Sequence, residues 1–101
     1  MDSPSQEVYD QAAEMVEGFS EVVTELQETI AEIMGCSLYI SGMLASGYPD
    51  PSNTLLDMQS KMQASITDLQ AQIANYQLMI NKSIALAATT VANLPPEPMM
   101  P

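Results

Sequence analysis

Apolar residues recur along the second half of the chain with the period of an α-helix. No Gly or Pro interrupts residues 52–94. Successive apolar positions are three or four residues apart and average 3.6, which fits a helix and does not fit a strand. This apolar stripe consists of Leu55, Met58, Met62, Ile66, Leu69, Ile73, Tyr76, Ile80, Ile84, Ala87 and Val91. The pattern predicts one helix from about residue 52 to residue 94.

The first half of the chain has a similar pattern and predicts a helix over about residues 4–46. Ser3 followed by Pro4 is typical of a helix N-cap with proline at the first helical position. Gly35 predicts a kink, because glycine inside a helix is about 1 kcal/mol less favourable than alanine. Gly47 marks the expected end of the helix. The apolar positions are Val8, Ala12, Met15, Phe19, Val22, Leu26, Ile30 and Ile33.

A turn is predicted between the two helices, because two prolines stand one residue apart where neither fits a helix interior. Asp50 is suited to capping the second helix. A connection this short makes the helices antiparallel neighbours. The expected fold is all-α: a two-helix antiparallel hairpin in one domain over 1–101, with a mobile proline-rich tail at 95–101. The predicted turn residues are Pro49, Asp50, Pro51, Ser52 and Asn53.

The hairpin interior is expected to pair the two apolar stripes. Residues predicted to pack within the chain are Phe19, Val22, Leu26, Ile30, Leu69, Ile73, Tyr76, Ile80 and Ile84. A second stripe on the later helix lies about 100° from the first, and from Leu69 to Leu94 only Lys82 is charged. A helix that is small or apolar on most sides is normally buried on most sides, so we expect other protein chains to cover this stripe. The predicted assembly interface is Ala74, Leu78, Ala85, Ala88 and Ala92.

The charge balance narrows the class of partner. The net charge is −11, from 13 acidic and two basic residues, which argues against binding nucleic acid or an anionic membrane surface. Acids gather on one face of the first helix, where Glu7, Glu14, Glu21 and Glu28 are seven residues apart. Two interpretations stay open. The face is solvated and keeps free subunits apart, or it contacts a basic partner.

Residues for catalysis or metal binding are scarce. The chain has no His and one Cys, which excludes a His-based catalyst, a His-ligated zinc and an intrachain disulfide. Cys36 is expected to be a small buried hydrophobic residue. No glycine-rich phosphate loop is present, so we expect no enzyme activity, no cofactor and no metal. No apolar run reaches the roughly 20 residues that span a bilayer, and no basic stretch precedes an apolar core, so neither membrane insertion nor a cleaved signal peptide is expected.

Two segments carry a resemblance to a known family. The turn and the run Leu55-Leu56-Asp57-Met58-Gln59-Ser60-Lys61-Met62 resemble type III secretion needle subunits. The segment Ile73-Ala74-Asn75-Tyr76-Gln77-Leu78 is similar to the related inner-rod subunits. The likeness covers roughly residues 49–90. It implies a secreted protomer that polymerises helically around a narrow export channel, with its C-terminal helix toward the interior.

The first function hypothesis is therefore a structural protomer of a type III secretion needle or inner rod. Its partners would be other copies of itself, other secretion-apparatus subunits or a dedicated chaperone. It would be cytoplasmic before export, and then extracellular or at the cell surface without a cleaved signal peptide. A second hypothesis is a cytoplasmic helical-hairpin chaperone or adaptor that dimerises and holds a secretion-related client. A third is a secreted hairpin of the WXG100 type, although the Trp-x-Gly turn of that family is absent.

Overall fold

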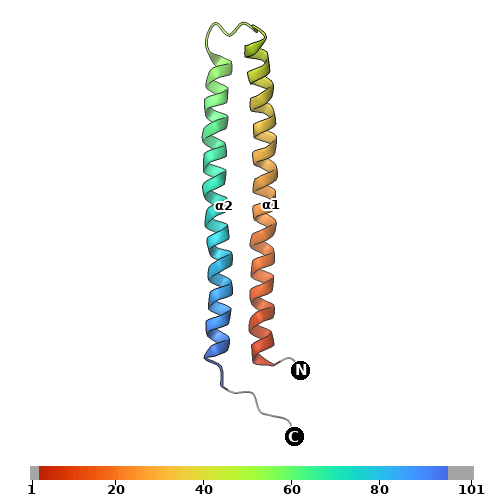
Figure 1. Cartoon of the computed structure of the whole chain (residues 1–101), viewed down its shortest axis with the longest axis vertical. Coiled ribbons are helices and arrows are strands. Elements are labelled where there is room, and N and C mark those ends of the chain that lie inside the picture. The colour runs from red at the N-terminus through yellow and green to blue at the C-terminus, as the bar shows by residue number, and fades with distance from the viewer. Residues whose placement is uncertain (1–2, 96–101) are drawn as a thin grey trace. The chain divides into compact units, whose positions relative to one another are not determined.

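The computed structural model describes residues 3–95 and contains two α-helices (Figure 1). Helix α1 spans Pro4–Ala45 and helix α2 spans Thr54–Ala92, joined by residues 46–53. The described residues contain no strand, so the fold is the all-α helical hairpin that the pattern predicts. The tail predicted at 95–101 falls, from residue 96 onward, outside the described residues.

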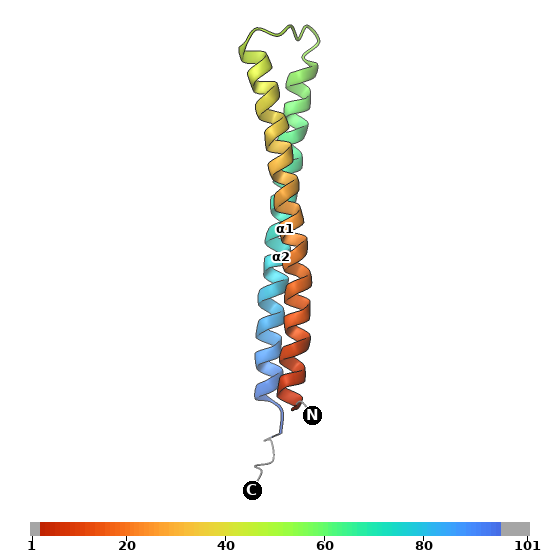
Figure 2. The same ribbon diagram turned by 90° about the vertical axis from the view of Figure 1, so that its right-hand side faces the viewer.

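The chain divides into two compact units, and each unit holds a segment of both helices. The terminal unit comprises Met1–Val22 and Asn75–Pro101, and the turn unit comprises Val23–Ala74. Within each unit, the segment of α1 and the segment of α2 lie side by side in both views (Figures 1 and 2). The short connection in the turn unit makes its two segments antiparallel. The single domain expected over 1–101 stays a prediction.

Helix α1 begins as the sequence predicts. The Ser3 hydroxyl oxygen accepts a hydrogen bond from the Gln6 backbone N–H at 3.2 Å. The Ser3 carbonyl accepts one from the Glu7 N–H at 3.0 Å. The first bond satisfies one of the amide groups that a helix start leaves without an intrahelical partner, and the second is the first backbone bond of the helix itself. Pro4 occupies the first helical position, where its missing N–H removes no bond.

The end of α1 is set by a left-handed glycine. Gly47 has a φ of +84°, which a residue with a side chain rarely adopts. Its N–H donates to the Leu44 carbonyl at 3.1 Å, and the Tyr48 N–H donates to the Met43 carbonyl at 3.0 Å. This pair of bonds is the Schellman motif that closes a helix C-terminus. Gly35 does not interrupt α1, which continues through it as one element.

Helix α2 begins two residues later than the sequence suggests. Asn53 has a φ of +57°, a left-handed conformation that keeps it outside the helix and makes Thr54 the first helical residue. Pro51 therefore lies in the turn and not at the first helical position. The two carboxylate oxygens of Asp50 accept hydrogen bonds from the N–H groups of Leu55 at 3.1 Å and Leu56 at 3.3 Å. Asp50 thus caps α2 from across the turn.

In the turn unit the packed positions of α2 alternate in steps of four and three residues. The partly or fully buried positions of this segment are Leu55, Gln59, Met62, Ile66, Leu69 and Ile73. A regular alternation of this kind has a period of 3.5, which is typical of a coiled coil and not of a straight helix. We call this line of packed positions between the two helices the seam. The seam therefore takes Gln59 where the sequence stripe takes Met58, whose side chain is 42% exposed.

In the terminal unit the seam differs from the sequence stripe at one further position. The seam of α2 contains Tyr76, Ile80, Ser83, Ala87 and Val91. Ile84, predicted to pack within the chain, is 53% exposed, so that prediction is wrong. The mean spacing of the stripe is the same as that of the seam, and only the phase differs. The seam steps from Ile80 to Ser83 and then to Ala87, which leaves Ile84 at its edge.

Full burial is confined to a few side chains. Among the described residues the buried apolar ones are Ile40, Ile66 and Ala87, each 5–6% exposed. Two adjacent helices provide only one shared seam, so most apolar side chains stay half-buried or exposed. Much apolar surface of each unit is consequently open to further contacts.

Candidate functional site

The predicted assembly stripe lies on the exposed outer face of α2. In the terminal unit Leu78 is 51% exposed, and Ala85, Ala88 and Ala92 are exposed as well. Ala74, the one member in the turn unit, is also exposed. The small Ala side chains leave room for a second helix to approach closely. The stripe has the geometry of an unpartnered helix face.

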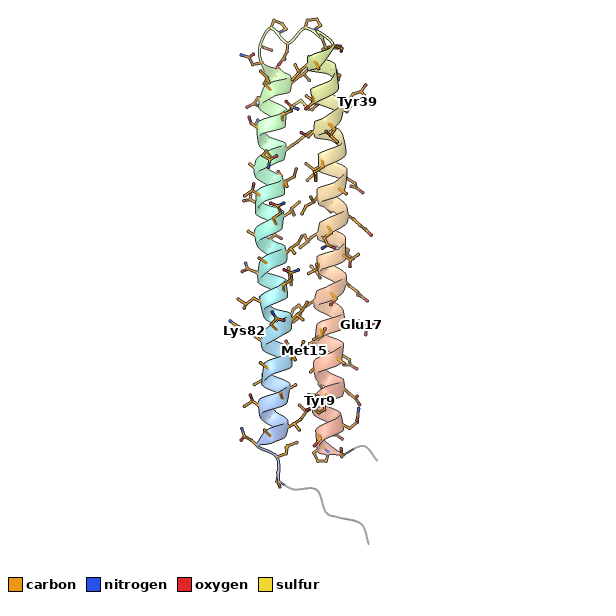
Figure 3. All side chains as sticks on the ribbon, viewed as in Figure 1. Tyr9, Met15, Glu17, Tyr39 and Lys82 are labelled. Atoms are coloured by element: carbon orange, nitrogen blue, oxygen red, sulfur yellow. The ribbon has the colours of Figure 1, made fainter. Side chains whose placement is uncertain are left out.

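Among the described residues of the terminal unit, all the acidic residues lie on α1. Lys82 is the one charged residue on the α2 segment of this unit, and Figure 3 shows it pointing away from α1. Glu17 projects outward from α1, away from α2 (Figure 3). The exposed acids of the α1 segment are Glu7, Asp10, Glu14, Glu17 and Glu21. The α1 segment of the unit thus presents an acidic surface, and the α2 segment presents a surface whose one charged residue is Lys82.

Most residues predicted to pack within the chain lie in the seam. In the terminal unit the rings of Phe19 and Tyr76 have centroids 5.9 Å apart and an interplanar angle of 46°. Such a tilted aromatic pair adds about 0.5–1.5 kcal/mol to the burial of its surface. Val22 and Ile80 are half-buried in the same unit. In the turn unit the half-buried predicted residues are Leu26, Ile30, Leu69 and Ile73.

Sequence reasoning missed a polar clamp in the seam of the turn unit. The Gln59 side-chain amide donates to the Ser37 carbonyl oxygen at 3.0 Å and to the Ser41 hydroxyl at 2.6 Å. Gln59 and Ser37 are half-buried, so the clamp ties α2 to α1 inside an otherwise apolar seam. Counting in steps of 3.5 from Met62 and Ile66 would have placed Gln59 in the seam.

A groove in the turn unit is the largest cavity described. It has a volume of about 660 Å³ and runs between the α1 and α2 segments. We call it the turn-unit groove. Tyr39, 71% exposed, stands at its rim and extends outward from α1 in Figure 3. The groove is lined by Glu32, Gly35, Cys36, Tyr39, Ile40, Met43, Leu55, Met58 and Met62.

Cys36 does not occupy the interior position expected for it. It is exposed and lines the turn-unit groove. The reason is again the phase of the seam, which passes through Ile33, Ser37 and Ile40 and leaves Cys36 beside it. The prediction that Cys36 is buried is therefore wrong.

A smaller groove lies in the terminal unit. Its volume is about 180 Å³, and its walls come from residues 8–15 of α1 and residues 83–90 of α2. Low-numbered α1 residues thus face high-numbered α2 residues, so these two segments are antiparallel. The lining residues are Val8, Gln11, Ala12, Met15, Ser83, Leu86, Ala87 and Thr90.

Acidic side chains in the described part of the chain do not gather into a metal-binding cluster. Among residues 3–95, no three His, Cys, Asp or Glu side chains are grouped closely enough to hold a metal ion. Lys61 pairs with Asp57 at 3.0 Å within one turn of α2, and both side chains are more than half exposed. Such a surface pair contributes little to stability. Neither described helix has a stretch long and apolar enough to cross a bilayer.

The chain is an all-α helical hairpin with two kinds of exposed apolar surface, namely the assembly stripe of α2 and the grooves between the helix segments of each unit. Comparison of the chain with models of protein families, with curated proteins and with solved structures finds no match.

Proposed function

We propose that this chain is a structural protomer that assembles with copies of itself and performs no catalysis. The assembly is the needle or inner rod of a bacterial type III protein secretion apparatus, in which the protomers surround an export conduit. The resemblance of the turn and of residues 73–78 to needle and inner-rod subunits supports the identity of the apparatus. The protomer is cytoplasmic before export and then lies at the cell surface or outside the cell.

One observation carries the self-assembly proposal: the exposed outer face of α2. Leu78, Ala85, Ala88 and Ala92 form an apolar face, bordered by Lys82, that is exposed within the terminal unit. In the same unit, the outer face of α1 is acidic. Stacking such hairpins buries the apolar face against neighbouring copies and leaves the acidic face in solvent, because burying an unpaired carboxylate is strongly unfavourable.

The test places a charge on the stripe. Ala88→Glu should abolish self-assembly, since it buries a carboxylate between helices. Helicity of the free subunit should be unchanged, because a solvent-facing substitution usually alters stability by no more than about 0.5 kcal/mol. The measurements are analytical sedimentation and circular dichroism on the variant and the parent.

Ala13→Glu is the matched control. Ala13 is an exposed alanine of the same unit, but it lies on α1. This variant should assemble like the parent. Normal assembly of Ala88→Glu, or a defined small oligomer of the parent in place of fibres under the electron microscope, would contradict the proposal and favour the adaptor hypothesis.

A further inference from the structure

The turn-unit groove differs in chemistry from the assembly stripe and calls for a different partner. Its lining contains no charged residue except Glu32. Residues 33–49 of the chain are entirely uncharged. Three of the lining side chains are the methionines Met43, Met58 and Met62, which are flexible and polarizable and adapt to the shape of a bound apolar surface.

The groove is acidic at one end. Glu32 lines it, and Glu28 and Glu25 lie four and seven residues earlier on α1, on the same side of that helix and exposed. The nearest cation in sequence, Lys61, lines a neighbouring cavity that shares Met58 and Met62 with the groove, and its ammonium group is paired with Asp57 at 3.0 Å. An occupant with Lys or Arg beside Glu32 and apolar residues beyond it would therefore match the groove in charge and in polarity.

A second copy of this chain matches that requirement poorly. It carries 13 acidic residues and two lysines, and one of these, Lys61, is paired with Asp57, so its net charge of −11 disfavours docking beside Glu25, Glu28 and Glu32. An amphipathic helix docks into an apolar groove through residues at positions i, i+3, i+4 and i+7. We propose that the turn-unit groove binds an amphipathic helix of another protein, with its apolar face against the methionines and its basic end beside Glu25, Glu28 and Glu32.

The binding experiment uses the full chain and three fluorescent probes. The first is a helical peptide with Leu at positions i, i+3, i+4 and i+7 and Lys at one end. The second has Glu in place of those lysines, and the third is a labelled copy of this chain. Fluorescence anisotropy should show the basic peptide binding about tenfold more tightly than the acidic one. Its affinity should fall as salt is added, since salt screens exposed charges.

Two matched pairs of variants locate the site. Glu32→Lys should weaken binding of the basic peptide about tenfold, whereas Glu17→Lys, an exposed acid in the terminal unit, should not. Met58→Ala should weaken binding, whereas Met34→Ala should not. Met58 and Met34 belong to the same unit and are 42% and 50% exposed, but only Met58 lines the groove. All four variants change exposed side chains, and circular dichroism should show unchanged helicity.

Three results would overturn the inference: no binding of the basic peptide, equal binding of the acidic peptide, or binding of the labelled copy of this chain that an excess of unlabelled basic peptide displaces. The last result would make a second copy the occupant. The inference does not depend on the self-assembly proposal, because Met58→Ala and Glu32→Lys leave the assembly stripe intact. Sedimentation of these variants should match that of the parent.

Discussion

At the scale of single residues, the least expected feature is the polar clamp inside the turn-unit seam. Gln59 donates to both Ser37 and Ser41 from a position where a coiled coil usually places an aliphatic side chain. A polar residue in a seam lowers stability relative to a well-packed apolar one, but a shifted register breaks its hydrogen bonds. We expect the clamp to favour the observed alignment of α1 with α2 next to the turn.

A double-mutant cycle tests the clamp. Gln59→Ala should destabilise the chain by about 1 kcal/mol, the usual net contribution of a hydrogen bond. Combined with Ser41→Ala, it should show a coupling energy of at least about 0.5 kcal/mol, because the two side chains are in contact. Urea unfolding of the parent, the two single variants and the double variant gives the coupling. Additive effects of the two substitutions would show that the contact contributes nothing to stability.

At the scale of elements, the phase of the seam along α2 decides which apolar residues hold the helices together. Ile80 and Ile84 have the same side chain and lie one turn apart. Ile80 is half-buried in the seam, while Ile84 is 53% exposed. Their different environments follow from the phase of the seam, which steps from Ile80 to Ser83 and Ala87 and passes beside Ile84.

Replacing each isoleucine with alanine tests which of the two side chains stabilises the subunit. Ile80→Ala should destabilise the subunit by about 2 kcal/mol, the lower end for removing buried aliphatic groups, because the site is half-buried. Ile84→Ala should change stability by less than about 0.5 kcal/mol. Unfolding in urea should be measured for both variants at a protein concentration too low for assembly, since a neighbouring copy in an assembly would cover Ile84. Equal destabilisation would place both residues in the seam.

At the scale of the whole molecule, charge dominates the expected association. The net charge of −11 makes copies of the chain repel one another. The 13 acidic residues lie mostly on α1. Self-assembly through α2 must therefore overcome the repulsion between the acidic α1 helices of neighbouring copies. Contact with a basic helix would instead be favoured by the same charge.

Salt should therefore move the two kinds of association in opposite directions. Raising NaCl from about 20 mM to about 0.5 M shortens the range of electrostatic interaction from about 20 Å to a few ångströms. Self-assembly followed by sedimentation should strengthen over this range, while binding of the basic peptide should weaken. Self-assembly that weakens as salt rises would indicate that contacts between unlike charges hold the copies together, and would contradict assembly through the apolar face of α2.

Local sequence determined most of the architecture. Ser3 and Pro4 fix the start of α1, Gly47 fixes its end, and Asp50 caps α2, because each acts through its own backbone or through atoms a few residues away. The apolar period identified both helices for the same reason. Only the tertiary structure decided the phase of the seam. The sequence stripe and the observed seam both cover residues 55–91 in ten steps that average 3.6, but the facing helix places Gln59 and Ser83 inside and leaves Met58, Ile84 and Cys36 outside. A single helix read by itself does not contain that information, because the seam is defined by the neighbour that it faces.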